Sequence, residues 1–308
     1  MTSSANSTSS LSNNLAGNWG RKAVIGIPLA FLLVFFLLPF LIVFKISVSE
    51  MDNVVFTDLV LWADGVLHLK LKLGNYIFIA LDDLYFETYL SSLKFAAVTT
   101  GICLLVAYPF AYFMARSPAD KRPALLMLVM LPFWTSFLLR VYAWKMLLAD
   151  NGVFNNFAIW AGLVSEPVKM MNTPFSLVLG MVYTYLPFMI LPLYANLVKM
   201  DLRLLESAQD LGATPWQAFW RITVPLSRSG VIAGAMLVFI PCVGEFVIPE
   251  LLGGPQTLMI GRVLWDEFFS NNDWPMAATV AVVMVLLIIV PLALFNKYQS
   301  DGAAGVRA

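Results

Sequence analysis

The sequence predicts an all-α polytopic membrane protein with six transmembrane helices. Of its 308 residues, 60% are hydrophobic and only 12% are charged, whereas soluble domains keep about 25% charged residues. Six apolar stretches are each long enough to cross a hydrocarbon core of about 30 Å, which takes roughly 20 residues. They lie at about residues 23–44, 90–114, 124–148, 174–198, 230–252 and 275–296.

The N-terminal region is expected to hold a tail and a retained first helix. Residues 1–20 are rich in Ser and Asn, a composition typical of disorder. Arg21 and Lys22 then precede the apolar stretch 23–44. This stretch is longer than the roughly 7–15 residues of a signal-peptide core, and no small-residue cleavage site ends it.

The distribution of basic residues predicts the orientation. If the N-terminus is cytoplasmic, the inward segments hold eleven Lys and Arg residues and the outward segments five. The positive-inside rule therefore places both termini in the cytoplasm, including a C-terminal tail over 297–308. The outward segments also hold twelve acidic residues, which suits a cationic ligand, a docking protein with a basic rim, or ordinary solvated loops.

The outward segment 45–88 is long enough to carry structure of its own. Leucines alternate with polar residues over 67–73, and this period of two predicts a half-buried strand. Asp64-Gly65 just before it is a hairpin turn signal. We therefore expect a short external β-hairpin.

Two charged residues fall inside predicted spans. Arg140 and Glu245 both lie about 22–24 Å from the inner ends of their spans at 1.5 Å per residue. Charges at such depth are costly and usually face the interior of a bundle. They could pair with each other, Arg140 could extend to the outer interface, or Glu245 could face the substrate pathway and meet a cation.

Aromatic residues near these charges have two possible roles. Trp134, Tyr183 and Tyr185 lie in the predicted third and fourth spans. Aromatic faces beside an acid can hold an organic ammonium by cation–π attraction, although core packing is the more common use.

The residues argue against catalysis within this chain. Cys103 and Cys242 both lie in apolar stretches, which indicates packing rather than a disulfide or metal pair. The single histidine, His68, excludes a histidine-rich metal site. The sequence contains neither a nucleotide-binding Gly-x-x-x-x-Gly-Lys-Ser/Thr motif nor a His-Glu-x-x-His or Gly-x-Ser-x-Gly element. We expect no cofactor, no metal and no catalytic residue.

A polar segment, 199–229, separates the fourth and fifth spans. Asp201 to Leu211 is predicted to form a helix that stops at Gly212. Thr214, followed by Pro and then Gln217, predicts a capping box that opens a second short helix. This helix should run to about Thr223, with Pro225 interrupting the chain before span five. From the residues alone, the segment is either a helix resting on the membrane surface or a docking element.

This segment resembles a known signature. The run Glu206-Ser207-Ala208-Gln209-Asp210-Leu211-Gly212, continued by Ile222-Thr223-Val224-Pro225, is similar to the signature loop of ABC importer permeases. That loop begins Glu-Ala-Ala, so Ser207 replaces an Ala, and Val-Pro replaces its later Leu-Pro. The resemblance implies docking to an ATPase subunit. Its coupling positions would be Glu206, Ser207, Ala208, Asp210 and Gly212.

Four further stretches are similar to permeases of polyamine ABC importers, most closely the putrescine type. They are residues 131–144, 151–156, 244–255 and 259–264. The resemblance implies a type I importer permease in a bacterial inner membrane, with its first helix at 23–44 and a permease core of five helices over 89–296. The substrate pathway would include Glu245, Trp134, Tyr183, Tyr185 and Arg140.

The resemblance also implies partners. These are two copies of an ATP-binding subunit, a second homologous permease, a periplasmic polyamine-binding protein and the lipid bilayer, with no nucleic acid. Two alternatives stay open: the same ABC role for another small solute, and an ATP-independent secondary carrier. An intramembrane enzyme is disfavoured by the missing motifs.

Overall fold

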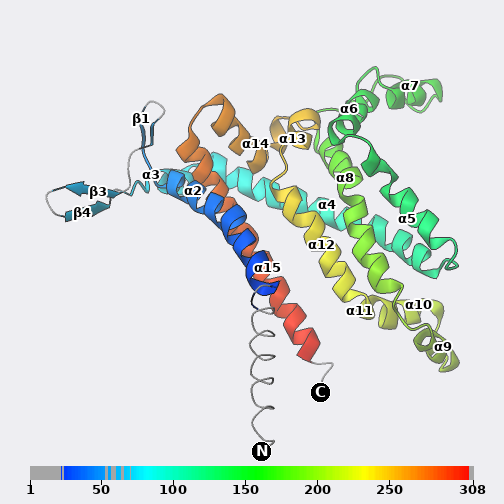
Figure 1. Ribbon diagram of the computed structural model, residues 1–308. Coiled ribbons are helices and arrows are strands. Elements are labelled where there is room, and N and C mark those ends of the chain that lie inside the picture. The colour runs from blue at the N-terminus through cyan, green and yellow to red at the C-terminus, as the bar shows by residue number, and fades with distance from the viewer. Residues whose placement is uncertain are drawn as a thin grey trace, which may run out of the picture. The chain divides into compact units, whose positions relative to one another are not determined.

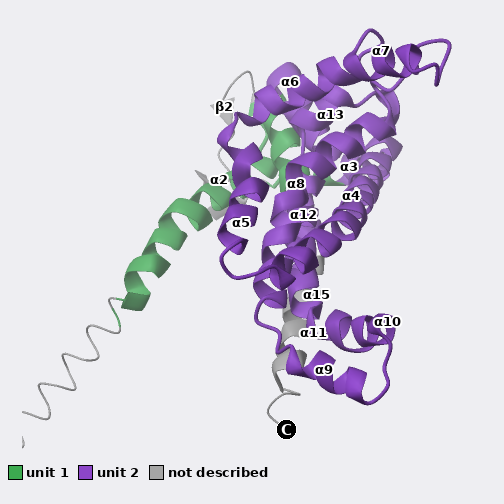
Figure 2. Cartoon of the chain, turned by 90° about the vertical axis from the view of Figure 1, so that its right-hand side faces the viewer, with its two compact units in different colours: residues 1–76, 273–282 green, residues 77–272, 283–308 purple. Residues whose placement is uncertain are grey.

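The structure, a computed structural model, describes residues 22, 24–52, 55–56, 60–63, 66–69 and 71–304. The predicted tail over 1–20 and the Asp64-Gly65 turn lie outside the described residues. The chain divides into two compact units, residues 1–76 with 273–282 and residues 77–272 with 283–308 (Figure 2). Each unit is described by itself.

The first unit begins with an exposed apolar helix, Val24–Ser47, which includes the π-helical turn η1 (Leu33–Leu37) and α2 (Leu38–Ser47). Pro39 near the start of α2 has no backbone N–H to donate, which explains why the regular ladder changes to a wider turn there. At its end, the Ser47 hydroxyl lies 2.7 Å from the Tyr76 hydroxyl, and Thr279 donates to the Ser47 carbonyl at 3.1 Å. The end of this helix is thereby tied to the start of α15 (Trp274–Ala304).

Four short strands follow. β1 (Met51–Asp52) pairs with β2 (Val55–Phe56), and β3 (Val60–Ala63) pairs antiparallel with β4 (Val66–Leu69), with Ala63 opposite Val66. The hairpin therefore occurs where the alternation predicts one, but the strand does not extend over 71–73. The amide of Lys72 instead donates to the carbonyl of Val48 at 2.9 Å, and its ammonium pairs with Glu50 at 3.0 Å.

The second unit is helical. Its elements in chain order are α3 (Gly74–Leu81), α4 (Asp83–Arg116), α5 (Arg122–Met130), η2 (Leu131–Trp134), α6 (Phe137–Leu148), α7 (Val153–Trp160), α8 (Pro174–Leu197), α9 (Arg203–Asp210), α10 (Pro215–Ala218), η3 (Phe219–Thr223), α11 (Val224–Leu226), α12 (Arg228–Val243), α13 (Val247–Leu252), η4 (Pro255–Thr257), α14 (Ile260–Trp265) and η5 (Asp266–Ser270). The rest of α15 completes it (Figure 1).

The core lies where α4, α8 and α12 pack against one another. Glycines allow the close approach of α12 to α8: a Cβ on Gly230 would lie 2.7 Å from Asn196 Cβ, and one on Gly234 would lie 2.7 Å from Met189 Sδ. Small residues are the usual means of bringing membrane helices together. Cys103 and Cys242 are both free and buried in this core, which confirms them as packing residues.

The count of spans differs from six. Three described helices are long and apolar enough to cross a membrane, Val24–Ser47, Asp83–Arg116 and Pro174–Leu197, and the count reaches five when each of two sharply bent pairs is taken as one span. The apolar helix Trp274–Ile289, at the place of the predicted sixth span, is shorter. The backbone of α15 nevertheless continues to Ala304, beyond the predicted end at 296.

Two predicted spans are not continuous helices. The stretch 124–148 breaks after Trp134, and its two arms, Arg122–Trp134 and Phe137–Trp160, meet at 84°. Pro132 lies in η2, just before the break, and the Thr135 hydroxyl in the break donates to the Pro132 carbonyl at 2.8 Å. The stretch 230–252 breaks at Gly244, which ends α12, and the chain re-enters a helix only at Val247.

Candidate functional site

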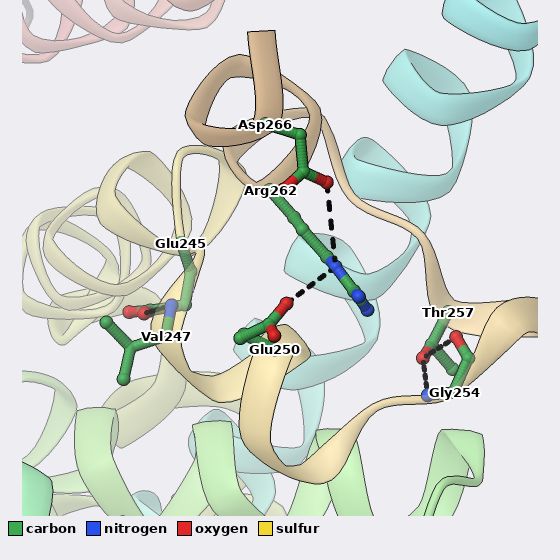
Figure 3. Close-up of polar contacts among 7 residues, drawn as sticks. All are labelled: Glu245, Val247, Glu250, Gly254, Thr257, Arg262 and Asp266. Carbon is green, nitrogen blue, oxygen red and sulfur yellow. Dashed lines mark hydrogen bonds and ion pairs between the residues drawn. The ribbon is translucent and has the colours of Figure 1, made fainter. Parts of the chain in front are cut away.

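The break between α12 and α13 is organised around Glu245. Its Oε1 accepts from the backbone amide of Val247 at 3.0 Å (Figure 3). It also accepts from the amide of Ile248 at 3.4 Å, and these two amides are the first donors of α13. Its Oε2 accepts a short hydrogen bond from the hydroxyl of Tyr185 on α8. The carboxylate is half-buried and Tyr185 is buried. A single side chain thus satisfies orphan amides at the start of a helix and fixes a tyrosine of the neighbouring one.

Helix α8 also holds the other end of α13. The buried Ser176 hydroxyl donates to the Leu252 carbonyl at 2.7 Å. Between these contacts, a Cβ on Gly180 would lie 2.5 Å from Leu252 Cδ1 and 3.1 Å from Ile248 Cγ2. Helix α8 therefore contacts α13 or the break before it at both ends.

Helix α14 closes the site from another side. A Cβ on Gly261 would lie 2.5 Å from the Gly244 carbonyl oxygen and 2.6 Å from that of Glu245, so only glycine permits this approach. The amide of Ile260 donates to the buried Ser92 hydroxyl of α4 at 2.7 Å. Arg262 carries its Nε 2.7 Å from Glu250 Oε2 and 4.0 Å from Asp266 Oδ2 (Figure 3). The backbone that carries Glu245 is thus supported by α4, α8 and α14.

The predicted pathway residues are only partly gathered. Tyr185 and Glu245 are in contact, whereas no ion pair between Arg140 and Glu245 occurs among the described residues, although α6 packs against α13. The Arg140 guanidinium lies 5.1 Å from the centre of the Phe133 ring. Its Nε and Nη1 are buried and have no hydrogen-bond partner within the part of the chain that the structure describes.

The other two aromatic residues lie elsewhere. Tyr183 is two residues from Tyr185 and so points to a different side of α8. Its ring contacts Trp144 edge-on at 5.4 Å and lines an apolar cavity of about 320 Å³ between α4, α5 and α8. Trp134, at the end of η2, is 69% exposed. Within the described residues, no group of three or more His, Cys, Asp or Glu side chains is placed to hold a metal ion.

The loop between α8 and α12 lies at the opposite end of these helices from α13 (Figure 1 and Figure 2). Helix α9 is one turn shorter than predicted because the Asp201 carboxylate accepts from the Arg203 amide at 3.0 Å and starts the helix there. Gly212 has φ +83°, and the Ala213 amide returns to the Ala208 carbonyl at 2.9 Å. Its role as the helix stop is confirmed.

The second short helix opens with the predicted capping box. The Gln217 amide donates to Thr214 Oγ1 at 3.3 Å, and Gln217 Oε1 accepts from the Thr214 amide at 3.0 Å. Pro225, however, does not interrupt the chain. It lies inside the continuous helix Pro215–Leu226, just after the π-helical turn η3, and the break comes at Ser227 with a bend of 63°.

Most of the five predicted coupling positions are exposed to solvent. Glu206, Ser207, Asp210 and Gly212 are exposed, and Ala208 is half-buried. Sequence reasoning missed the large apolar side chains beside them. Leu211 is 88% exposed, and Trp216 and Trp220 are also exposed. Large apolar residues within the polar segment 199–229, next to the predicted helix corner, were the sequence signal that could have found them.

The comparisons with known proteins agree with this fold. The family of binding-protein-dependent transport system inner membrane components matches residues 15–299. The chain belongs to this family of multi-pass membrane proteins, and it is a non-catalytic permease component of an ABC importer, with ATP hydrolysis in a separate subunit. This membership excludes the ATP-independent carrier and the intramembrane enzyme.

Individual relatives are more specific. The spermidine/putrescine transport system permease protein PotB of Salmonella typhimurium (strain SL1344) is 38% identical over 288 residues, which cover 91% of this chain and 96% of the relative. PotB of Escherichia coli (strain K12) is 40% identical over 263 residues, covering 84% and 92%. The inner membrane ABC transporter permease protein YdcU of Escherichia coli (strain K12) is 34% identical over 69% of this chain and 71% of the relative.

Solved structures show the same fold at low identity. A bacterial ABC transporter involved in import of the acidic polysaccharide alginate matches with a TM-score of 0.63 and 18% identity, covering 94% of this chain and 98% of that one. The MetNI methionine ABC transporter matches with a TM-score of 0.53 and 14% identity, covering 70% and 94%.

Proposed function

We propose that this permease moves polyamines, putrescine and spermidine, from the periplasm to the cytoplasm. The observation that carries the proposal is the 38–40% identity, over most of the chain, to permeases named for spermidine and putrescine. Both termini lie in the cytoplasm in this proposal, as the basic residues predict. A periplasmic polyamine-binding protein would deliver the substrate, and a second homologous permease would complete the pathway.

Glu245 is the proposed contact for an ammonium group. A putrescine dication needs carboxylate or aromatic partners once it leaves water, because an unpaired charge is costly away from solvent. Glu245 is a half-buried carboxylate in a helix break, and no basic side chain pairs with it in the described residues. Tyr185 would hold it in place, while Trp134, Tyr183 and Arg140 would line other parts of the pathway.

The loop between α8 and α12 is the proposed docking element for one of the two copies of the ATP-binding subunit. Its support is the family signature at Glu206 to Gly212 together with the exposure of those positions. Leu211 and Trp216 add an apolar surface that an ATPase groove would cover.

The test separates charge from helix capping. Labelled putrescine and spermidine uptake is measured in cells lacking this gene and complemented with the natural chain, Glu245→Gln or Glu250→Gln. Glutamine keeps an oxygen for the amides of α13 but removes the charge, so only Glu245→Gln should lose uptake at equal membrane levels. Glu250, a carboxylate of the adjoining helix α13 that pairs with Arg262 of α14, is the matched control.

Two outcomes would contradict the proposal. Full uptake by Glu245→Gln would show that this carboxylate only caps α13. A natural chain that restores neither polyamine, with its partners present, would favour another small solute.

A further inference from the structure

The loop between α8 and α12, the proposed docking loop, joins α12 through a segment that packed aromatic rings hold in place. Phe219, the first residue of the π-helical turn η3, meets the edges of two tyrosines of α4. Its ring centre lies 5.6 Å from that of Tyr108 at 84° and 5.8 Å from that of Tyr112 at 86°. The two tyrosines are four residues apart and so share one face of α4.

A hydrogen bond fixes the same segment at its bend. Ser227 is fully buried at the 63° break between α11 and α12, and its Oγ lies 2.8 Å from the Tyr108 hydroxyl. Ser227 Oγ also donates to the Val224 carbonyl at 3.0 Å. Since its single hydrogen serves that bond, Tyr108 is the donor in the other. Tyr108 therefore contacts both ends of the connection, Phe219 through its ring and Ser227 through its hydroxyl.

The segment between these contacts is not a relaxed helix. Residues 219–223 form a π-helical turn, which Pro225 explains here as Pro39 does at η1, because proline has no backbone N–H to donate. The Thr223 hydroxyl is buried and has no hydrogen-bond partner among the described residues. A buried hydroxyl without a partner is unfavourable, so this turn does not satisfy all of its own polar groups.

We propose that Tyr108, Phe219 and Ser227 form a joint that transmits movement of the docking loop to α4 and α12 together. The inference rests on the proposed docking of an ATPase at this loop. Packed aromatic edges and a buried hydrogen bond resist gradual deformation, so the loop and the two helices move as one body or change in one step. These three are positioning residues: they contact neither nucleotide nor substrate.

The experiment uses the whole transporter, reconstituted in liposomes with its ATP-binding subunits, second permease and binding protein. Tyr108→Phe and Ser227→Ala each remove one hydroxyl, and the double variant removes both. Tyr112→Phe is the matched control, because it keeps the ring against Phe219, and its hydroxyl makes none of the side-chain hydrogen bonds found in the described residues. Three quantities are measured: retention of the ATPase, ATP hydrolysis and polyamine uptake per ATP.

The expected result is uncoupling. Tyr108→Phe and Ser227→Ala retain the ATPase and hydrolyse ATP, but uptake per ATP falls about fivefold or more, within the usual range of coupling between sites. The double variant is no worse than either single one, and Tyr112→Phe behaves like the natural chain.

Other results would contradict the proposed role of this joint. Unchanged uptake per ATP in both single variants would show that the bond carries no coupling. Loss of the ATPase from Tyr108→Phe would show that it stabilises docking instead. Failure of the proposed function looks different, since the natural chain itself would then retain no ATPase or import no polyamine.

Discussion

The hydroxyl of Tyr185 on α8 donates a short hydrogen bond to Glu245, sixty residues further along the chain. This contact joins the middle of one core helix to the interruption of another. Because Glu245 also accepts from the first amides of α13, the tyrosine positions both a carboxylate and a helix start. The geometry of the proposed substrate contact therefore depends on α8.

Tyr185→Phe should loosen the position of the Glu245 carboxylate without abolishing transport. Loss of a hydrogen bond to a charged group costs about 1–3 kcal/mol, so the unfolding temperature in detergent should fall and polyamine uptake should drop. Tyr112→Phe is the control, since the Tyr112 hydroxyl makes none of the side-chain hydrogen bonds found in the described residues and Tyr112 is not among the proposed pathway residues. Equal effects of the two substitutions would argue against a special role for Tyr185.

Gly212→Asp should stop transport while the membrane helices stay folded. At φ +83° a side chain costs about 1–2 kcal/mol, but no atom of the described residues lies within 4 Å of the added Cβ. The new side chain would therefore project from the proposed docking surface. Gly212→Asn has nearly the same shape without the charge and should retain more uptake, together with the ATPase on co-purification. Normal transport by Gly212→Asp would rule out docking at this corner.

Arg140→Met should not destabilise the isolated subunit. Two guanidinium nitrogens of Arg140 are buried without hydrogen-bond partners in the described part of the chain, and apolar replacement of buried charge is often neutral or stabilising. Thermal unfolding should show an equal or higher midpoint, with uptake reduced if Arg140 lines the pathway as proposed. Lys145→Met, an exposed basic residue of the same helix, is the control. A clearly lower midpoint for Arg140→Met alone would mean that the guanidinium stabilises the subunit.

Gly261→Ala should disturb Glu245 through its backbone. The added methyl would lie 2.5 Å from the Gly244 carbonyl oxygen, and overpacking of this kind costs roughly 1–3 kcal/mol. Uptake should fall more than the amount of protein in the membrane. Gly101→Ala in α4 meets no described atom within 4 Å and should be neutral or slightly stabilising. Equal behaviour of both variants would contradict the tight approach of α14.

Short-range sequence signals predicted the structure of the loop between α8 and α12 well. Gly212 and the Thr214 capping box act within a few residues, so the sequence contains everything that decides them. Pro225 was misjudged because the helix passes the proline through the π-helical turn η3 and breaks only at Ser227, whose hydroxyl contacts Tyr108 of another helix.

The interrupted spans could not be predicted in the same way. Hydropathy marks 124–148 and 230–252 as continuous, because a break at Thr135 or Gly244 leaves the average apolar character unchanged. The hydrogen-bond partners of Glu245 could not be predicted from the sequence either. Arg140 is the opposite charge that composition suggests, whereas the observed partners are a tyrosine of another helix and two backbone amides.

The capped interruption at Glu245 has a consequence for leakage. Free amides at membrane depth normally attract water, and a water-filled break would give protons and small ions a route through the resting protein. Here the carboxylate occupies the amides of Val247 and Ile248 itself. The interruption therefore leaves neither of these two amides free to recruit water, at the point where we propose that a charged solute is received.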